Sequence, residues 1–197
     1  PEEAMERFEL EDINPAPSKL PYDKLEWLNG VYIREKLTTE ELAERLEPFF
    51  VEAGCDIGRE KLIEAVPLVR NRIKTLPDAL DFLAFLCKDE ITIEDPQNLI
   101  QPKMDAQRTI EALRAAYDTL AAMEGFDVEE QERLLRGLAG EMGLKAGQLL
   151  GTLREAVTAQ KVSPPLFETM AVIGKETVLK RIVAAAELLE KTVEHEN

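Results

Sequence analysis

The sequence predicts an all-α protein in which two consecutive helical bundles follow a short connector. Apolar residues recur every three to four positions through most of the chain, as they do on the buried face of a helix. Residues 88–105 break this period, contain two prolines and lack a long apolar stripe, which makes them the best candidate for a boundary. We therefore expect a connector at 1–37, a first helical domain at 38–95 and a second at 96–197.

The connector and the first bundle each begin with a helical pattern. Residues 22–34 have apolar positions in a helical register, and Trp27, the only tryptophan, is expected on their packing face. Thr38 and Glu41 stand three residues apart, the spacing of a capping box, in which each side chain accepts from the other residue's backbone N–H. A helix is therefore predicted to begin at this pair and to end near Gly54.

The rest of the first bundle is predicted to contain two more helices. The pattern over residues 60–74 runs through Pro67, which a helix tolerates only as a kink or a restart because proline has no N–H. Pro77 begins the next helix. In the boundary segment, Ile-Thr-Ile at 91–93 has the alternation of a short strand, although one strand alone makes no sheet.

After the boundary the chain returns to the helical period. Asp127 is a predicted N-cap, and Gly143 is a predicted helix stop. Ser163 is also predicted as an N-cap, with Pro164 at the first helical position, where a missing N–H costs nothing. The helices expected in this half begin near Ala106, Asp127, Lys145, Ser163 and Glu176.

The distribution of charge is compatible with a nucleic-acid partner, although the chain as a whole is acidic. The net charge of −15 argues against a polyanion at first, because nucleic-acid binding needs a basic surface. Two segments depart from that average: residues 59–74 carry five cations against two acids, and residues 145–181 carry six against three. Each segment is a local positive patch that can meet phosphates while the rest of the surface repels them.

The second positive patch contains a predicted helix, a polar loop and the start of another helix. Lys145, Arg154 and Lys161 lie within it, and the helix start after Ser163 exposes backbone N–H groups. This arrangement suits an anion or a carbonyl oxygen. From the residues alone, the alternative is a well-formed helix–turn–helix that holds no ligand.

Several kinds of chemistry have no support in the sequence. Cys55 and Cys87 have no metal-ligand spacing, and we expect two reduced thiols rather than a disulfide. His195 is the only histidine, which excludes histidine-based triads and multi-histidine metal sites. No apolar run approaches the roughly 20 residues of a membrane span, and the acidic start is no signal peptide, so we expect a cytoplasmic protein. Because the chain begins at Pro1, we expect a piece of a longer one.

Three stretches, taken together, resemble bacterial glutamyl-tRNA synthetases. Residues 25–34, LEWLNGVYIR, are similar to the family segment L-x-W-[LM]-N-G-x-Y-I-R. Residues 66–76, VPLVRNRIKTL, are similar to V-x-L-[VM]-[RQ]-x-R-[IF]-x-T-L. Residues 145–168 are similar to K-x-G, then L-R-x-A-[LV]-T-G, then [ST]-P-x-L-F-E. The order and spacing agree, and the resemblance extends over about residues 8–182.

The resemblance implies the C-terminal, anticodon-binding half of such an enzyme. The family's H-I-G-H-like and K-[ML]-S-K-like signatures belong to an N-terminal catalytic domain that uses ATP and Mg, and neither occurs here. This chain would therefore have no cofactor and no activity alone. The implied partners are the anticodon loop of tRNA-Glu and the N-terminal catalytic domain of the same enzyme. We expect a monomer that does not bind membranes.

The resemblance also assigns roles to individual residues. Arg72 matches the arginine that reads the third anticodon base, which discriminating enzymes have and relaxed ones often lack. Arg154 and Leu166 match residues at the first base, and Ser163 with Pro164 matches the pair at the middle base. Such side chains can bind the edges of unstacked loop bases. The cations expected to contact phosphates are Arg70, Lys145 and Lys161.

One residue departs from the family pattern. Ala159 stands where the family usually has glycine after Thr158. If this position requires a positive φ, the loop must reshape or be strained. Two alternatives to an RNA-binding fragment stay open. One is an acidic helical module that binds a protein. The other, suggested by Ala159, is a fold that persists although tRNA binding is lost.

Overall fold

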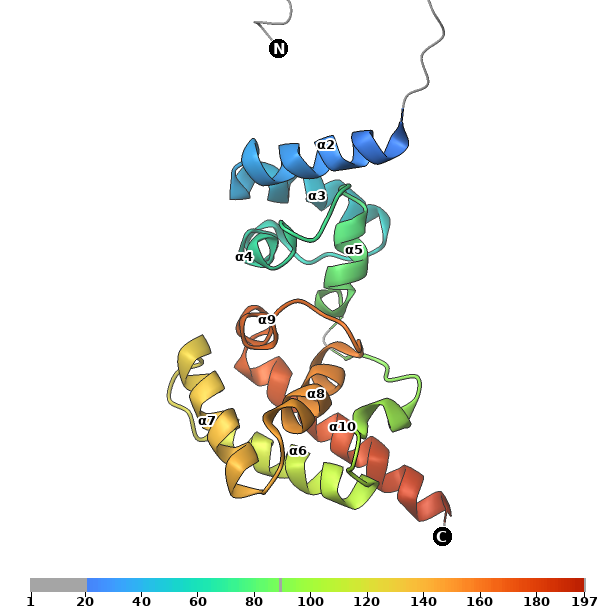
Figure 1. Ribbon diagram of the computed structural model, residues 1–197, viewed down its shortest axis with the longest axis vertical. Coiled ribbons are helices and arrows are strands. Elements are labelled where there is room, and N and C mark those ends of the chain that lie inside the picture. The colour runs from blue at the N-terminus through green and yellow to red at the C-terminus, as the bar shows by residue number, and fades with distance from the viewer. Residues whose placement is uncertain (1–20, 89, 197) are drawn as a thin grey trace, which may run out of the picture.

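The computed structural model describes residues 21–88 and 90–196, except the side chains of the last two. Every regular element in these ranges is a helix, so the all-α prediction is confirmed, and Ile-Thr-Ile at 91–93 forms no strand (Figure 1). The elements are α2 (Tyr22–Glu35), α3 (Thr39–Glu52), α4 (Arg59–Val69), α5 (Asp78–Leu83), η2 (Ala84–Leu86), η3 (Pro96–Leu99), α6 (Ala106–Ala121), α7 (Val128–Glu141), α8 (Ala146–Thr158), α9 (Leu166–Ile173) and α10 (Lys175–Glu196). No helix in the described ranges is both long enough and apolar enough to cross a membrane.

The capping box at the start of α3 forms as its sequence predicts. The Glu41 N–H donates to Thr38 Oγ1 at 3.1 Å, and the Thr38 N–H donates to Glu41 Oε2 at 2.8 Å. These bonds satisfy two backbone donors that the first turn of a helix leaves unpaired. Leu42, Leu46 and Phe50 of α3 are fully buried, and α3 packs along α4.

Helix α4 is shorter than its apolar pattern predicts. It ends at Val69 instead of near residue 74, two residues after Pro67. Pro67 has no N–H, so one backbone hydrogen bond of the helix is missing, and α4 ends two residues later. Asp78 then organises this turn, because its Oδ2 accepts from the N–H groups of Lys74 at 2.9 Å and Thr75 at 2.8 Å.

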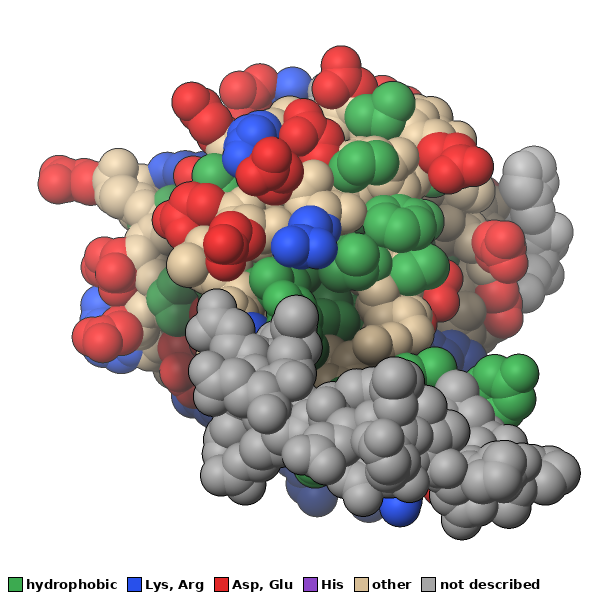
Figure 2. Space-filling model, turned by 90° about the horizontal axis from the view of Figure 1, so that it is seen from above, with side chains coloured by type: hydrophobic (Ala, Val, Ile, Leu, Met, Phe, Trp, Pro, Cys, Tyr) green, Lys and Arg blue, Asp and Glu red, His purple; other side chains and the backbone are tan. Residues whose placement is uncertain are grey.

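The predicted core role of Trp27 is wrong. Its side chain is 64% exposed, and α2 buries only Gly30 and Ile33. Helix α2 lies at one end of the molecule, beyond α3 (Figure 1). Seen from that end, hydrophobic side chains gather among acidic ones (Figure 2). The exposed large hydrophobic residues of α2 are Tyr22, Leu25, Trp27, Leu28 and Tyr32, called the α2 patch below.

The helices form two groups: α3, α4, α5 and η2 make up the first, and the second forms around α6, α8 and α10. Asp105 caps α6 by accepting from the Arg108 N–H at 2.7 Å. Asp127 caps α7, as predicted, by accepting from Glu129 and Glu130 N–H groups at 2.9 and 3.1 Å. Helices α6 and α10 pack along each other, and α8 lies against both. The buried apolar side chains of the two groups form one continuous core, in which α4 contacts α9.

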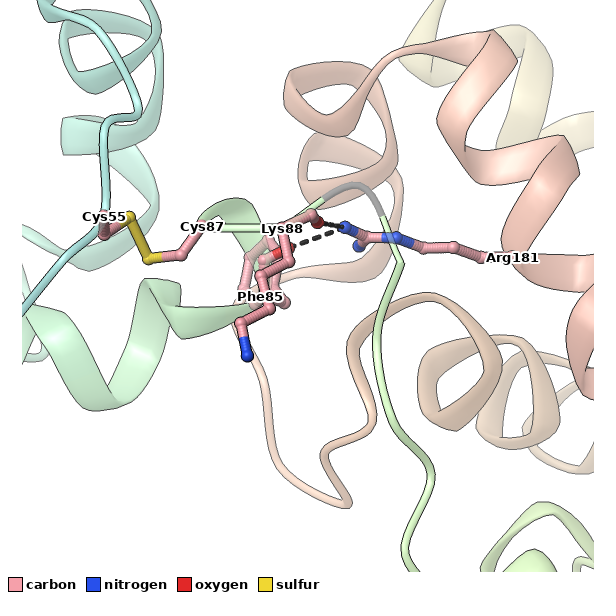
Figure 3. The surroundings of a disulfide bond; sticks show 5 residues. All are labelled: Cys55, Phe85, Cys87, Lys88 and Arg181. Atoms are coloured by element: carbon pink, nitrogen blue, oxygen red, sulfur yellow. Dashed lines mark hydrogen bonds between the residues drawn. A yellow bond between two sulfur atoms is a disulfide. The ribbon is translucent and has the colours of Figure 1, made fainter.

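The prediction of two reduced thiols is also wrong, because Cys55 and Cys87 form a disulfide (Figure 3). They are 32 positions apart in sequence, and no local pattern indicates a pair. The fold places the turn after α3 beside the end of η2, with the two Cα atoms 4.9 Å apart. That separation is within the range that a disulfide spans.

Candidate nucleic-acid interface

Two arginines from different helix groups are neighbours, and one of them, Arg72, lines a groove between α4 and α9. Arg72 lies in the turn after α4, where its N–H donates to Val69 O at 2.7 Å, and its side chain is exposed. Arg154 lies in α8, one turn before its end. The groove beside Arg72 has a volume of about 580 Å³. Its lining residues are Glu64, Pro67, Leu68, Asn71, Arg72, Val128, Pro165, Glu168, Ala171 and Val172.

The two guanidinium groups are close enough to repel each other. Burial, and second the positive charge of Arg72, lower the pKa of the Arg154 guanidinium from its ordinary value. Among the described residues, no carboxylate forms an ion pair with either arginine. Two neighbouring cations without an acid partner favour an anionic or carbonyl-rich ligand, because such a ligand relieves their repulsion.

Arg154 also determines the shape of the loop between α8 and α9. Its Nη1 donates to Ser163 Oγ at 2.5 Å and to Pro164 O at 2.8 Å. Ser163 is 5% exposed, and its hydroxyl also lies 3.1 Å from Pro164 O. One guanidinium nitrogen therefore binds both residues that the family resemblance assigns to the middle anticodon base.

The predicted N-cap at Ser163 is wrong. Helix α9 begins at Leu166, and its N-cap is Pro165, which makes no side-chain capping bond. The physical reason is the pair of prolines: a residue that precedes proline is disfavoured in helical backbone, so Pro164 cannot start the helix before Pro165. The hydroxyl of Ser163 binds Arg154 instead of a helix N-terminus.

The remaining predicted site residues are not all at the groove. Leu166 is 4% exposed and belongs to the core beneath the loop. Arg70 Nη2 donates to Thr39 Oγ1 at 3.3 Å, which holds it toward α3. Lys161 is exposed in the loop itself. Lys145 caps the opposite end of α8, about 13 Å along the helix from Arg154 at 1.5 Å per residue.

Ala159 has a positive φ, the backbone conformation that the usual glycine of the family would adopt without strain. It ends α8 with φ 52° and ψ 32°, in the left-handed region, and its N–H donates to Glu155 O at 2.8 Å. The loop keeps this shape with alanine, at the strain that a Cβ brings to left-handed backbone. Thr158 Oγ1 supports it by donating to Arg154 O at 2.7 Å and accepting from the Gln160 N–H at 3.2 Å.

Gln160 contributes to this site without any signal in the sequence. Its Nε2 donates to Asp81 O at 2.9 Å, so the loop beside Arg154 is tied directly to α5 of the other helix group. Its Oε1 is buried without a hydrogen-bond partner among the described residues. A glutamine in a polar loop has no periodicity or spacing that predicts such a bridge.

Comparison with known proteins gives the family of this fold. Residues 41–186 match the model of a family described as anticodon binding domain. The chain is 44% identical over 195 residues to a glutamate–tRNA ligase of Roseiflexus castenholzii, covering 95% of this chain and 38% of that protein. It is 36% identical over 189 residues to the glutamate–tRNA ligase of Thermus thermophilus, covering 93% and 38%. The chain therefore spans about two-fifths of the length of the curated relatives it matches.

A solved structure has the same fold. A glutamate tRNA ligase from Elizabethkingia meningosepticum, in complex with its amino acid, superposes with a TM-score of 0.80 at 20% sequence identity. The match covers 95% of this chain and 36% of that one. At this identity the superposition shows the fold alone.

Proposed function

This chain belongs to the anticodon-binding domain family, in the form found in glutamate–tRNA ligases, and from that premise we propose that its groove binds the anticodon loop of tRNA-Glu. The observation that carries the proposal is the pair Arg72 and Arg154, two adjacent cations from separate helix groups without a carboxylate partner in the described residues. Single-stranded loops are the usual target of sequence-specific RNA recognition, since their bases are unstacked and their edges are free.

Arg72 and Arg154 are suited to contact different bases of the anticodon. Arg72, exposed and without a side-chain partner among the described residues, is suited to a bidentate contact with the third anticodon base. Arg154 already donates to the loop with one nitrogen, which leaves its other N–H groups for the first base. Ser163 and Pro164 would meet the middle base through the backbone that Arg154 holds. Leu166 supports the first base from below.

The cations around the groove contribute affinity without reading sequence. Lys161 is the best placed for a phosphate, because it is exposed on the loop that carries Ser163. Arg70 and Lys145 lie farther away and would contact phosphates only along the stem. Each phosphate contact releases counterions, so binding should weaken as salt rises.

The test is binding of a fluorescently labelled tRNA-Glu anticodon stem-loop, measured by anisotropy at fixed salt. Arg72→Ala should weaken binding of the cognate loop by about 1–3 kcal/mol, roughly 5- to 150-fold, and abolish the preference at the third base. Arg59→Ala is the matched control, since Arg59 lies at the other end of α4 and pairs with Glu44 at 3.2 Å. Equal losses in both variants would contradict a reading role for Arg72.

The proposal extends to the protein that would contain this chain. We infer that it is the C-terminal part of a glutamate–tRNA ligase, whose N-terminal catalytic domain would use ATP and Mg, and that this part is inactive alone. We also propose that it acts as a monomer in the cytoplasm. Aminoacylation assays of this chain, alone and with a catalytic domain supplied in trans, test the first inference, and sedimentation tests the second.

The α2 patch is a second surface, and its residues do not line the groove. It lies outside the matched range 41–186, at the far end of α3, and its aromatic residues are typical of a protein contact. Among the described residues, this patch is the feature that favours an acidic protein-binding module. Glu26 of α2 pairs with Lys74 at 3.5 Å, so α2 lies beside the turn that carries Arg72.

A further inference from the structure

The disulfide joins two segments of the first helix group. Cys55 lies in the turn between α3 and α4 and is 3% exposed. Cys87 follows η2 and is partly exposed. Figure 3 shows the bond at the edge of this group, with Arg181 reaching toward it from the other side. The covalent bond thus fixes the turn between α3 and α4, where the Cys55 N–H donates to Phe50 O at 2.9 Å, to the end of η2.

Arg181 of α10 holds the same short segment from the second helix group. Its side chain is 4% exposed. Nη2 donates to Phe85 O at 2.7 Å and to Lys88 O at 2.6 Å, the carbonyls on either side of Cys87 (Figure 3). Nη1 donates to Val157 O at 2.6 Å, in the last turn of α8. A buried guanidinium at the ends of η2 and α8 satisfies carbonyls that have no helical partner.

These contacts attach α4 to the second group at two places. Its C-terminal end packs on α9 beside Arg72. The turn that precedes its N-terminal end is linked through Cys55 and Cys87 to the segment that Arg181 holds. The two attachments lie at opposite ends of α4, whose eleven residues span about 16 Å at 1.5 Å per residue. Two separated attachments fix the direction of a helix, whereas one allows it to pivot.

We propose that the Cys55–Cys87 disulfide and Arg181 form a redox-sensitive junction that positions Arg72 opposite Arg154, so that reduction of the disulfide weakens recognition of the anticodon loop. The inference rests on the proposed function of the groove. Arg181 acts here as a positioning residue, through the carbonyls of Phe85 and Lys88, and does not touch the RNA. Arg72 lies in the turn that follows α4, and the disulfide anchors the turn that precedes the same helix.

The difference in exposure between Cys87 and Cys55 predicts which sulfur a reducing thiolate attacks first. A thiolate of an external dithiol protein of the thioredoxin class attacks Sγ of the more exposed Cys87. The Sγ–Sγ bond breaks, and Cys55 leaves as a thiolate that takes a proton from solvent. The second thiol of the dithiol then attacks the mixed disulfide and releases Cys87. The protein gains two electrons and two protons, and the dithiol becomes a disulfide.

The test compares oxidised and reduced protein in stem-loop binding at fixed salt. Coupling between two sites is typically about 5- to 150-fold, and we expect the reduced form to lose roughly 5-fold of its preference for the cognate third base. Reoxidation should restore it. The Cys55→Ser/Cys87→Ser variant should match the reduced form and ignore the dithiol. Arg181→Met should lose the same preference while its disulfide is intact, and Arg181→Lys should recover part of it.

A measurement without RNA separates this inference from the proposed function. Amide hydrogen exchange should rise on reduction in residues 70–76 and 159–165, on both sides of the groove. Exchange that rises only beside Cys55 and Cys87 would overturn the junction, as would a preference for the third base that survives reduction. If neither redox form binds the stem-loop, the proposed function fails whatever the exchange pattern shows.

Discussion

The strain at Ala159 predicts that glycine at this position makes the protein more stable. Left-handed backbone costs an L-residue about 1–2 kcal/mol, and Ala159 has φ 52° and ψ 32°. Against this gain, glycine raises the entropy of the unfolded chain by about 0.4–1 kcal/mol. We expect Ala159→Gly to raise the free energy of unfolding by about 0.5–1 kcal/mol. For a chain of this size that corresponds to a Tm about 1–4 °C higher.

Differential scanning calorimetry of the two proteins measures the shift, and stem-loop binding should stay within about two-fold because the loop keeps its shape. Ala184→Gly is the matched control. It removes the same methyl group from an exposed position inside α10, and we expect it to lower stability by about 0.5–1 kcal/mol. Opposite signs for the two substitutions support the strain at Ala159. A Tm for Ala159→Gly that falls with that of the control would refute it.

Two further substitutions test local features of the fold. Thr38→Ala removes the side-chain half of the capping box and should lower the free energy of unfolding by about 1 kcal/mol in urea denaturation; an unchanged midpoint would contradict the cap. For Glu155, burial, partly offset by Lys161 and reinforced by Asp95, raises the pKa of the carboxyl group. Its ionised form is therefore disfavoured in the folded state, so stability is lost as pH rises from the unfolded pKa to the folded one. Glu155→Gln should stabilise the protein at pH 7, with an advantage that vanishes below about pH 4, and an equal advantage at both pH values would contradict this.

The features that the sequence predicts correctly are local ones. The capping box of Thr38 and Glu41 and the cap at Asp127 need only residues three positions apart, and the structure has both. The helical period likewise predicts where α6, α8 and α10 begin, since each buries one continuous face, although α10 continues to Glu196, beyond its predicted end near Lys191. Local hydrogen bonding and amphipathic spacing do not depend on the rest of the fold.

The features that the sequence misses depend on neighbours far along the chain or on two rules in competition. Trp27 has the spacing of a core residue, but no described element covers its face of α2. Ser163 has the residue type of an N-cap, but the second proline delays α9. Cys55 and Cys87 pair only because the turn after α3 meets η2. Gln160 and Arg181 join the helix groups through carbonyls that any sequence supplies.

Photochemical crosslinking tests most directly whether the groove between the two helix groups binds the anticodon loop. A tRNA-Glu stem-loop with 4-thiouridine in the anticodon would be irradiated with the oxidised protein, and the attached peptides identified by mass spectrometry. We predict crosslinks to residues 70–76 and to residues 159–168, from both sides of the groove. Crosslinks confined to α2, or to the exposed faces of α6 and α10, would contradict the account.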